Sequence, residues 1–181
     1  MIQDFIVPFI VLGLAELGDK TQLTVFCLAA KTKKHWQLLL GVILAFIIAD
    51  GLAILLGDYI TKIIPMNYVK IAVGIIFIIF GIITLIGSKE EGSKCNLKNP
   101  FLSGFGLILI SEMGDKSQIA SGLFAIKYNA LIVFISVIIV LTLLSIMAIY
   151  LGKFLVEKLN RRIVSYFAGG LFLIIGITCF F

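Results

Sequence analysis

Six stretches of the sequence are long and apolar enough to cross a lipid bilayer. A helix that spans the hydrocarbon core needs about 20 mostly apolar residues. Lipid offers no hydrogen-bond partners, so such a segment must form a helix or part of a closed β-barrel, and these stretches lack the alternation typical of barrel strands. The sequence therefore predicts an all-α membrane protein. The six predicted transmembrane helices are Phe5–Ala30, Leu38–Gly57, Val69–Ile86, Phe101–Ile126, Leu131–Leu151 and Ile163–Phe181.

Composition supports lipid as the solvent of this chain. Of the 181 residues, 61% are hydrophobic and 14% are charged, and the mean hydropathy is +1.17. A soluble domain of this length cannot bury so much apolar surface. The net charge of +5 is spread over short loops, so we predict no nucleic-acid partner. Three cysteines, Cys27, Cys95 and Cys179, are far apart and odd in number, which favours free thiols.

The second half of the sequence repeats the first. Phe9, Glu16, Gly18, Asp19, Lys20, Gln22, Ala29 and Lys31 recur in order as Phe105, Glu112, Gly114, Asp115, Lys116, Gln118, Ala125 and Lys127. Each half contains three predicted helices, so the second half enters the membrane from the opposite side. Such an inverted repeat is typical of secondary transporters, whose site lies near the midplane. We assign residues 1–87 to the first three-helix repeat, 88–100 to a cytoplasmic linker and 101–181 to the second three-helix repeat of one membrane domain.

Basic residues in the loops predict the orientation. Cytoplasmic loops of membrane proteins carry an excess of lysine and arginine. Ten basic residues follow the first, third and fifth predicted helices, against three on the opposite side. The ten are Lys31, Lys33, Lys34, Lys89, Lys94, Lys98, Lys153, Lys158, Arg161 and Arg162, and the three are Lys62, Lys70 and Lys127. We therefore expect a plasma-membrane protein with both termini extracellular.

Two matched charged motifs lie inside the apolar segments. ELGDKT begins at Glu16 and EMGDKS begins at Glu112. Each glutamate lies roughly 17 Å into its segment, near the middle of the bilayer, where a charge costs at least about 2.5–3.5 kcal/mol and usually marks an ion pathway. Carboxylate and amide oxygens from two such motifs suit a hard cation. The predicted metal ligands are Glu16, Asp19, Gln22, Glu112, Asp115 and Gln118.

Several roles around these motifs stay open. Gly18 and Gly114 either break their helices or only allow close helix packing. Lys20 and Lys116 either pair with the glutamate four residues earlier or serve as counter-charges when the site is empty. Asp50, a further intramembrane acid, is an accessory ligand, a proton-handling group or the partner of a motif lysine. Thr21 and Ser117 are expected to face away from the acids on an unbroken helix.

The charge of these groups predicts exchange of a metal for protons. Four motif acids and Asp50 contribute −5, and Lys20 and Lys116 contribute +2, so the ionised site carries −3. A low-dielectric interior does not tolerate this charge, so the acids must bind a metal or take up protons. A divalent ion leaves −1, and about two protons restore the same balance after its release. Metal and protons would therefore compete for the same oxygens.

The duplicated motif, on the first and fourth of six predicted helices, resembles that of the transmembrane-protein-165 family. That family includes Golgi manganese/calcium–proton exchangers and bacterial manganese exporters. The resemblance covers the whole chain and implies export of Mn²⁺, or of Ca²⁺, in exchange for protons. It places the metal-handling acids on Glu16, Asp19, Glu112 and Asp115. It implies no cofactor, since the metal is the substrate, and one chain is sufficient to form the site, although a dimer stays open.

Rival functions make different demands on the same acids. An intramembrane aspartyl protease needs two acids that share a proton, whereas this chain has four motif acids and adjacent lysines. An exporter of basic amino acids could hold an ammonium group with the same carboxylates. A passive channel does not need an inverted repeat with acids at its midplane. We therefore expect a transporter rather than an enzyme, with Mn²⁺ versus Ca²⁺, H⁺ versus Na⁺ and the stoichiometry left open.

Overall fold

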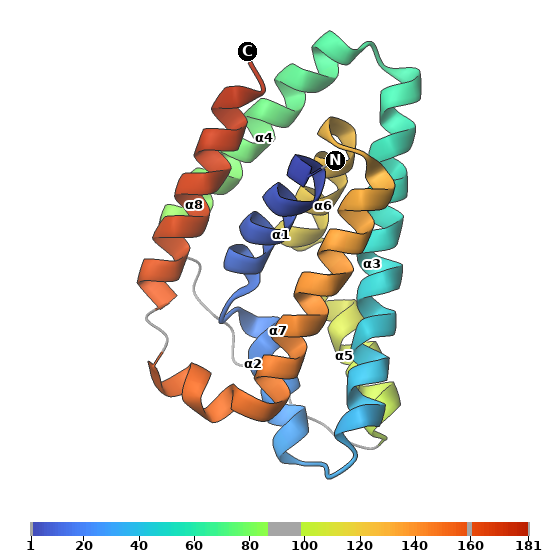
Figure 1. Ribbon diagram of the computed structural model, residues 1–181, viewed down its shortest axis with the longest axis vertical. Helices are drawn as coiled ribbons and strands as arrows, with labels where there is room; N and C mark the ends of the chain where they lie inside the picture. The colour runs from blue at the N-terminus through green and yellow to red at the C-terminus, as the bar shows by residue number, and fades with distance from the viewer. Residues whose placement is uncertain (1, 87–98, 159–160, 181) are drawn as a thin grey trace.

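The computed structural model describes residues 2–86, 99–158 and 161–180 (Figure 1). Within these ranges the secondary structure is helical, with no strand, which confirms the all-α prediction. The helices are α1 (Ile2–Glu16), α2 (Lys20–Ala30), α3 (His35–Ile63), α4 (Met66–Ile86), α5 (Pro100–Glu112), α6 (Lys116–Lys127), α7 (Ala130–Lys158) and α8 (Arg161–Thr178). Most of the predicted linker, 88–100, lies outside the described residues.

Three helices in the described part of the chain are long and apolar enough to cross a membrane on their own. They are α3, the Tyr68–Ile86 part of α4 and the Ala130–Leu151 part of α7. Shorter apolar helices are Pro100–Glu112 and Tyr166–Thr178. The predicted count of six spans therefore stays a prediction, because the other three segments are divided or short.

Two of the predicted spans are each divided into two helices. The segment Phe5–Ala30 contains α1 and α2, and Phe101–Ile126 contains α5 and α6. The sequence left open whether these helices break at their glycines, and the structure shows that both do. The two junctions lie away from both ends of the molecule (Figure 1).

The long helix of each half packs against the divided helices of the other half. Helix α3 contacts α5 and α6, while α7 contacts α1 and α2. Buried Val42, Ala45 and Phe46 from α3 and Ile108 from α5 belong to one continuous hydrophobic core. Helix α1 also contacts α6, and α2 contacts α5, so the junctions α1–α2 and α5–α6 lie close to each other.

Helices α4 and α8 pack closely through glycines at matched positions of the repeat. A Cβ atom on Gly74 would lie 3.0 Å from the carbonyl oxygen of Gly176, and one on Gly81 would lie 3.0 Å from that of Gly169. Side chains at these positions would separate the two backbones, as in other small-residue interfaces between membrane helices. Phe77 and Phe172, also matched by the repeat, stack with ring centroids 5.9 Å apart.

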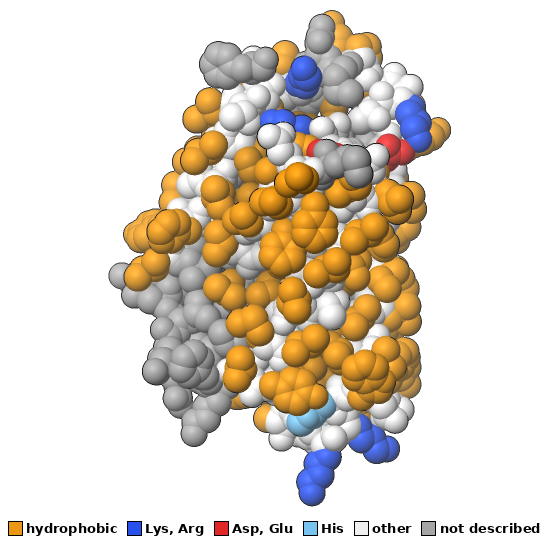
Figure 2. Space-filling view, viewed as in Figure 1, with side chains coloured by type: hydrophobic (Ala, Val, Ile, Leu, Met, Phe, Trp, Pro, Cys, Tyr) orange, Lys and Arg blue, Asp and Glu red, His pale blue; other side chains and the backbone are white. Residues whose placement is uncertain are grey.

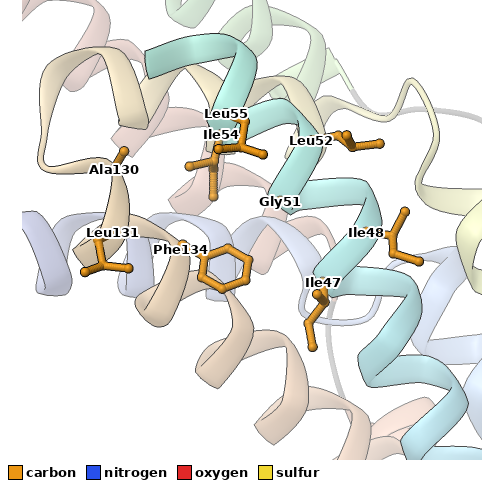
Figure 3. Close-up of a pocket in the computed structure, with 9 residues that line it drawn as sticks. All are labelled: Ile47, Ile48, Gly51, Leu52, Ile54, Leu55, Ala130, Leu131 and Phe134. Carbon is orange, nitrogen blue, oxygen red and sulfur yellow. The ribbon is translucent and has the colours of Figure 1, made fainter. Parts of the chain in front are cut away.

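The exterior fits a bilayer. Figure 2 shows hydrophobic side chains over the middle of the visible face and basic side chains at its two ends. The two termini lie toward the same end, opposite the loop between α2 and α3 (Figure 1). An outer groove of about 510 Å³ lies between α3 and α7, and Figure 3 shows its apolar lining. It is lined by Ile47, Ile48, Gly51, Leu52, Ile54, Leu55, Ala130, Leu131 and Phe134, without an ion-binding side chain.

One cysteine prediction is wrong. Cys27 is disulfide-bonded, whereas Cys179 is a free, buried thiol as expected. The prediction for Cys95 falls outside the described residues. Sequence spacing failed at Cys27 because distance along the chain does not exclude a pair that the fold brings together.

Candidate metal centre

A left-handed glycine interrupts each motif. Gly18 has φ 81° and Gly114 has φ 80°, in a region that residues with a Cβ atom rarely adopt. The aspartate that follows each glycine is extended and stands as the N-cap of the next helix, Asp19 for α2 and Asp115 for α6. The Asp19 carboxylate accepts a hydrogen bond from the backbone N–H of Lys20 at 2.8 Å. The glycine therefore redirects the chain and places the aspartate at a helix N-terminus.

The two motif glutamines close these turns. The backbone N–H of Gly18 donates to Oε1 of Gln22 at 3.1 Å, and that of Gly114 donates to Oε1 of Gln118 at 2.7 Å. Gln118 also donates from Nε2 to the carbonyl oxygen of Ala49 at 3.0 Å. An amide oxygen has two lone pairs, so these contacts leave one available. The structure thus gives both glutamines a role in the turn, and their role as metal ligands stays a prediction.

Three carboxylates from the two motifs converge. One ligand atom from each of Glu16, Asp19 and Asp115 lies within 4.8 Å of the others. Glu16 is 2% exposed, and its Oε1 has no hydrogen-bond partner. Oδ2 of Asp115 is likewise buried without a partner. Buried carboxylate oxygens without partners are costly unless a cation or proton satisfies them, so this cluster fits an oxygen-coordinated metal ion.

The motif lysines reach across to the opposite motif. Nζ of Lys20 lies 3.6 Å from Oδ1 of Asp115, and Nζ of Lys116 lies 3.5 Å from Oδ2 of Asp19. The alternative in which each lysine pairs with the glutamate four residues earlier is therefore not what the structure has. A break in the helix removes the regular turn that this spacing requires. The two crossed ion pairs instead join the two halves of the chain at the acidic cluster.

Glu112 lies in a different environment from Glu16. Its carboxylate is completely buried and accepts hydrogen bonds from Oγ1 of Thr21 at 2.6 Å and from Oγ of Ser117 at 3.4 Å. The expectation that both hydroxyls face away from the acids is wrong, because it assumed unbroken helices. Recognising the glycine as a break would have identified Thr21, since it lies in the first turn of the new helix α2.

Asp50 is buried in α3 and faces α6. Oγ of Ser121 donates to Oδ1 of Asp50 at 2.9 Å, while Oδ2 has no partner. The alternative of an ion pair with a motif lysine is not seen, since both lysines pair with the motif aspartates. Sequence reasoning missed Ser121 because its repeat counterpart is Val25, so the repeat gives no signal there.

The family model of "Divalent cation/proton antiporter GDT1" matches residues 4–92 and 100–181. The chain belongs to this family. The GDT1 family is one of membrane transporters, so the predicted resemblance is confirmed and the predicted class of transport protein is supported. The matched ranges cover both halves of the chain.

Two relatives within the GDT1 family cover nearly all of the chain, and a third covers about half of it. A protein of Vibrio cholerae named "Putative manganese exporter" is 27% identical over 93% of this chain and 86% of its own length. A GDT1-like protein of Synechocystis is 25% identical over 98% and 97%. The Saccharomyces cerevisiae protein named "Divalent cation/proton antiporter GDT1" is 35% identical over 49% of this chain and 31% of its own length. No solved structure matches. The comparisons support neither the protease nor the exporter of basic amino acids.

Proposed function

We propose that this chain exports a divalent cation, with Mn²⁺ as the first candidate and Ca²⁺ as the second, in exchange for protons. The observation that carries the proposal is the convergence of Glu16, Asp19 and Asp115 within 4.8 Å. The name of the Vibrio cholerae relative favours Mn²⁺. The family description favours protons over Na⁺ as the exchanged ion.

The ligand chemistry supports this class of metal. Carboxylate oxygens suit Mn²⁺, Ca²⁺ and Mg²⁺, whereas Zn²⁺ and Cu⁺ favour thiolate or imidazole ligands. The cluster contains three carboxylates and neither histidine nor cysteine. Gln22 and Gln118 could add amide oxygens from the turns. Glu112, whose carboxylate accepts hydrogen bonds from Thr21 and Ser117, would support these ligands from the neighbouring position. Asp50 would act as an accessory group behind the site.

The fold supports alternating access. Two half-sites, each at a broken helix, meet across the interface between the repeats, and transporters commonly place their sites at such junctions. We propose six spans arranged as two inverted three-helix repeats, with α1–α2 and α5–α6 each serving as one divided span. Rocking of one half against the other would then expose the acids to each side in turn. The crossed ion pairs lie at the interface that this motion must rearrange.

The proposed direction of transport depends on the orientation of the chain. Lys31, Lys33 and Lys34 lie at the end of the molecule opposite the termini, which agrees with a cytoplasmic loop and extracellular termini. Fusion of a reporter that is active only in the cytoplasm tests this orientation. We expect no activity from a C-terminal fusion and full activity from a fusion in the loop between α2 and α3. The reverse pattern would overturn the assignment.

Purified protein in proteoliposomes tests the transport reaction. With both sides buffered independently, an outward Mn²⁺ flux should drive protons in the opposite direction, and an imposed pH gradient should drive Mn²⁺ movement. Mn²⁺ movement that follows a Na⁺ gradient and ignores pH would contradict proton exchange.

Growth of a deletion strain that is impaired by excess Ca²⁺ but not by excess Mn²⁺ would make Ca²⁺ the substrate.

A further inference from the structure

The crossed lysines occupy the same carboxylates that form the candidate metal centre. Lys20 lies 3.6 Å from Asp115, and Lys116 lies 3.5 Å from Asp19. Both aspartates belong to the cluster that could hold a metal ion. A carboxylate oxygen that faces an ammonium group cannot give its full charge to a metal at the same time. Metal binding and lysine binding at these two aspartates are therefore competing events.

One divalent ion carries the same charge as the two lysine ammonium groups that it would replace. Glu16, Asp19 and Asp115 carry −3 when ionised, and two lysine ammonium groups or one divalent ion each contribute +2. A monovalent ion contributes only +1 and does not compensate for the loss of both lysine contacts. The lysines also remain accessible enough to move away, because their side chains are 43% and 24% exposed.

We propose that the ammonium groups of Lys20 and Lys116 take the place of the metal when the site is empty, by pairing with Asp115 and Asp19, and that one divalent cation displaces both of them. This role rests on the proposed metal centre and adds to it a basis for selecting divalent over monovalent ions. It also keeps the acidic cluster compensated after the metal leaves. Oε1 of Glu16 and Oδ2 of Asp115, both buried without a hydrogen-bond partner, would be the first oxygens available to an arriving ion.

Metal binding by lysine variants tests the competition directly. We expect the variant Lys20→Met/Lys116→Met to bind Mn²⁺ roughly tenfold more tightly than the natural protein, because two partly exposed ion pairs no longer oppose binding. We expect Lys20→Arg/Lys116→Arg to bind it several-fold more weakly, because a guanidinium holds a carboxylate through two parallel hydrogen bonds. The arginine variant keeps the charge, so a general field effect would leave its affinity unchanged. Unchanged affinity in the arginine variant would thus overturn the proposal.

Lys62→Met is the matched control. Lys62 pairs with Asp58 at 2.7 Å outside the acidic cluster, so its removal takes away one charge and one ion pair without touching the site. Its Mn²⁺ affinity should equal that of the natural protein. Equal gains in affinity for Lys62→Met and for the double methionine variant would also overturn the proposal.

A second measurement on the natural sequence avoids any dependence on how the variants fold. With ¹³C-dimethylated lysines, Ca²⁺ should shift the signals of Lys20 and Lys116 but not that of Lys62, and K⁺ at the same ionic strength should shift none of them. Static lysine signals at saturating Ca²⁺ would refute displacement. If the natural protein bound no divalent ion at all, the proposed function itself would fail. Binding of a divalent ion without displacement of the lysines would refute only the competition proposed here.

Discussion

The two motif junctions, α1–α2 and α5–α6, have the same backbone design but different surroundings. Both have a glycine with positive φ, both have an aspartate at the N-cap, and in both the glutamine oxygen accepts the glycine N–H. The glutamates differ. Glu16 has an oxygen without a partner beside the two aspartates, whereas Glu112 accepts hydrogen bonds from Thr21 and Ser117.

This difference shows that a repeated motif does not imply repeated roles. The hydroxyls of Thr21 and Ser117, one from each motif, both donate to Glu112. Asp50 adds a further acid on that side, and its repeat counterpart Ser145 bonds only to its own helix, at the carbonyl oxygen of Leu141. We infer that the cluster around Glu16 is the metal side of the site and that Glu112 supports it from behind. The predictions below test this division of roles.

The largest effect is expected from neutralising the three clustered acids. Glu16→Gln, Asp19→Asn and Asp115→Asn should each insert normally and lose more than about 100-fold in Mn²⁺ affinity, because removal of groups that only orient metal ligands already costs about 10–100-fold. Transport in vesicles should fall to background. Asp58→Asn is the control, since Asp58 lies outside the cluster and pairs with Lys62. Normal flux through any one of the three variants would remove that residue from the centre.

Glu112→Gln should have a smaller effect than Glu16→Gln. The amide still offers an oxygen to Thr21, but a negative charge close to the cluster is lost. We expect a loss of about tenfold in Mn²⁺ affinity, at the lower end of the range for residues that support metal ligands. Equal losses in the two variants would show that both glutamates are ligands, as the sequence alone suggested. Normal flux would show that Glu112 has no part in the site.

Sequence alone identified the positions of the acids but not how they meet. Hydropathy was sufficient for the helical class, since apolar length directly reflects the demands of lipid. The repeat was sufficient to match Glu16 with Glu112. It could not separate their roles, because identical residues at equivalent positions carry no information on their contacts. The crossed pairs between lysines and aspartates depend on left-handed backbone at Gly18 and Gly114, and a glycine in a sequence is equally compatible with close helix packing.

Loss of the Thr21 hydroxyl should lower stability by about 1–2 kcal/mol. Thr21→Val keeps the size of the side chain but leaves a buried carboxylate oxygen of Glu112 without its donor at 2.6 Å. Ser117→Ala should cost less, because its contact is 3.4 Å long. Thermal unfolding in detergent measures both, with Ser145→Ala as the control for loss of a hydroxyl that bonds only within its helix. A larger loss for Ser117→Ala than for Thr21→Val would contradict the geometry around Glu112.

The smallest effect is expected from alanine at the glycines of the two turns, Gly18 and Gly114. Comparing the two variants tests whether the two helix breaks are equivalent. Gly114→Ala introduces a methyl group into open space, so its cost of about 1 kcal/mol should come only from the left-handed backbone. Gly106 in α5 provides the matched control, because its Cβ would also meet nothing while its backbone is helical, so Gly106→Ala should raise stability by up to about 1 kcal/mol. Gly18 has nearly the same φ, so the left-handed backbone should lower the free energy of unfolding of Gly18→Ala by the same amount as that of Gly114→Ala. If unfolding measurements showed stabilisation by Gly114→Ala, the helix would be continuous there, and the meeting of Asp19 with Asp115 would lose its structural basis.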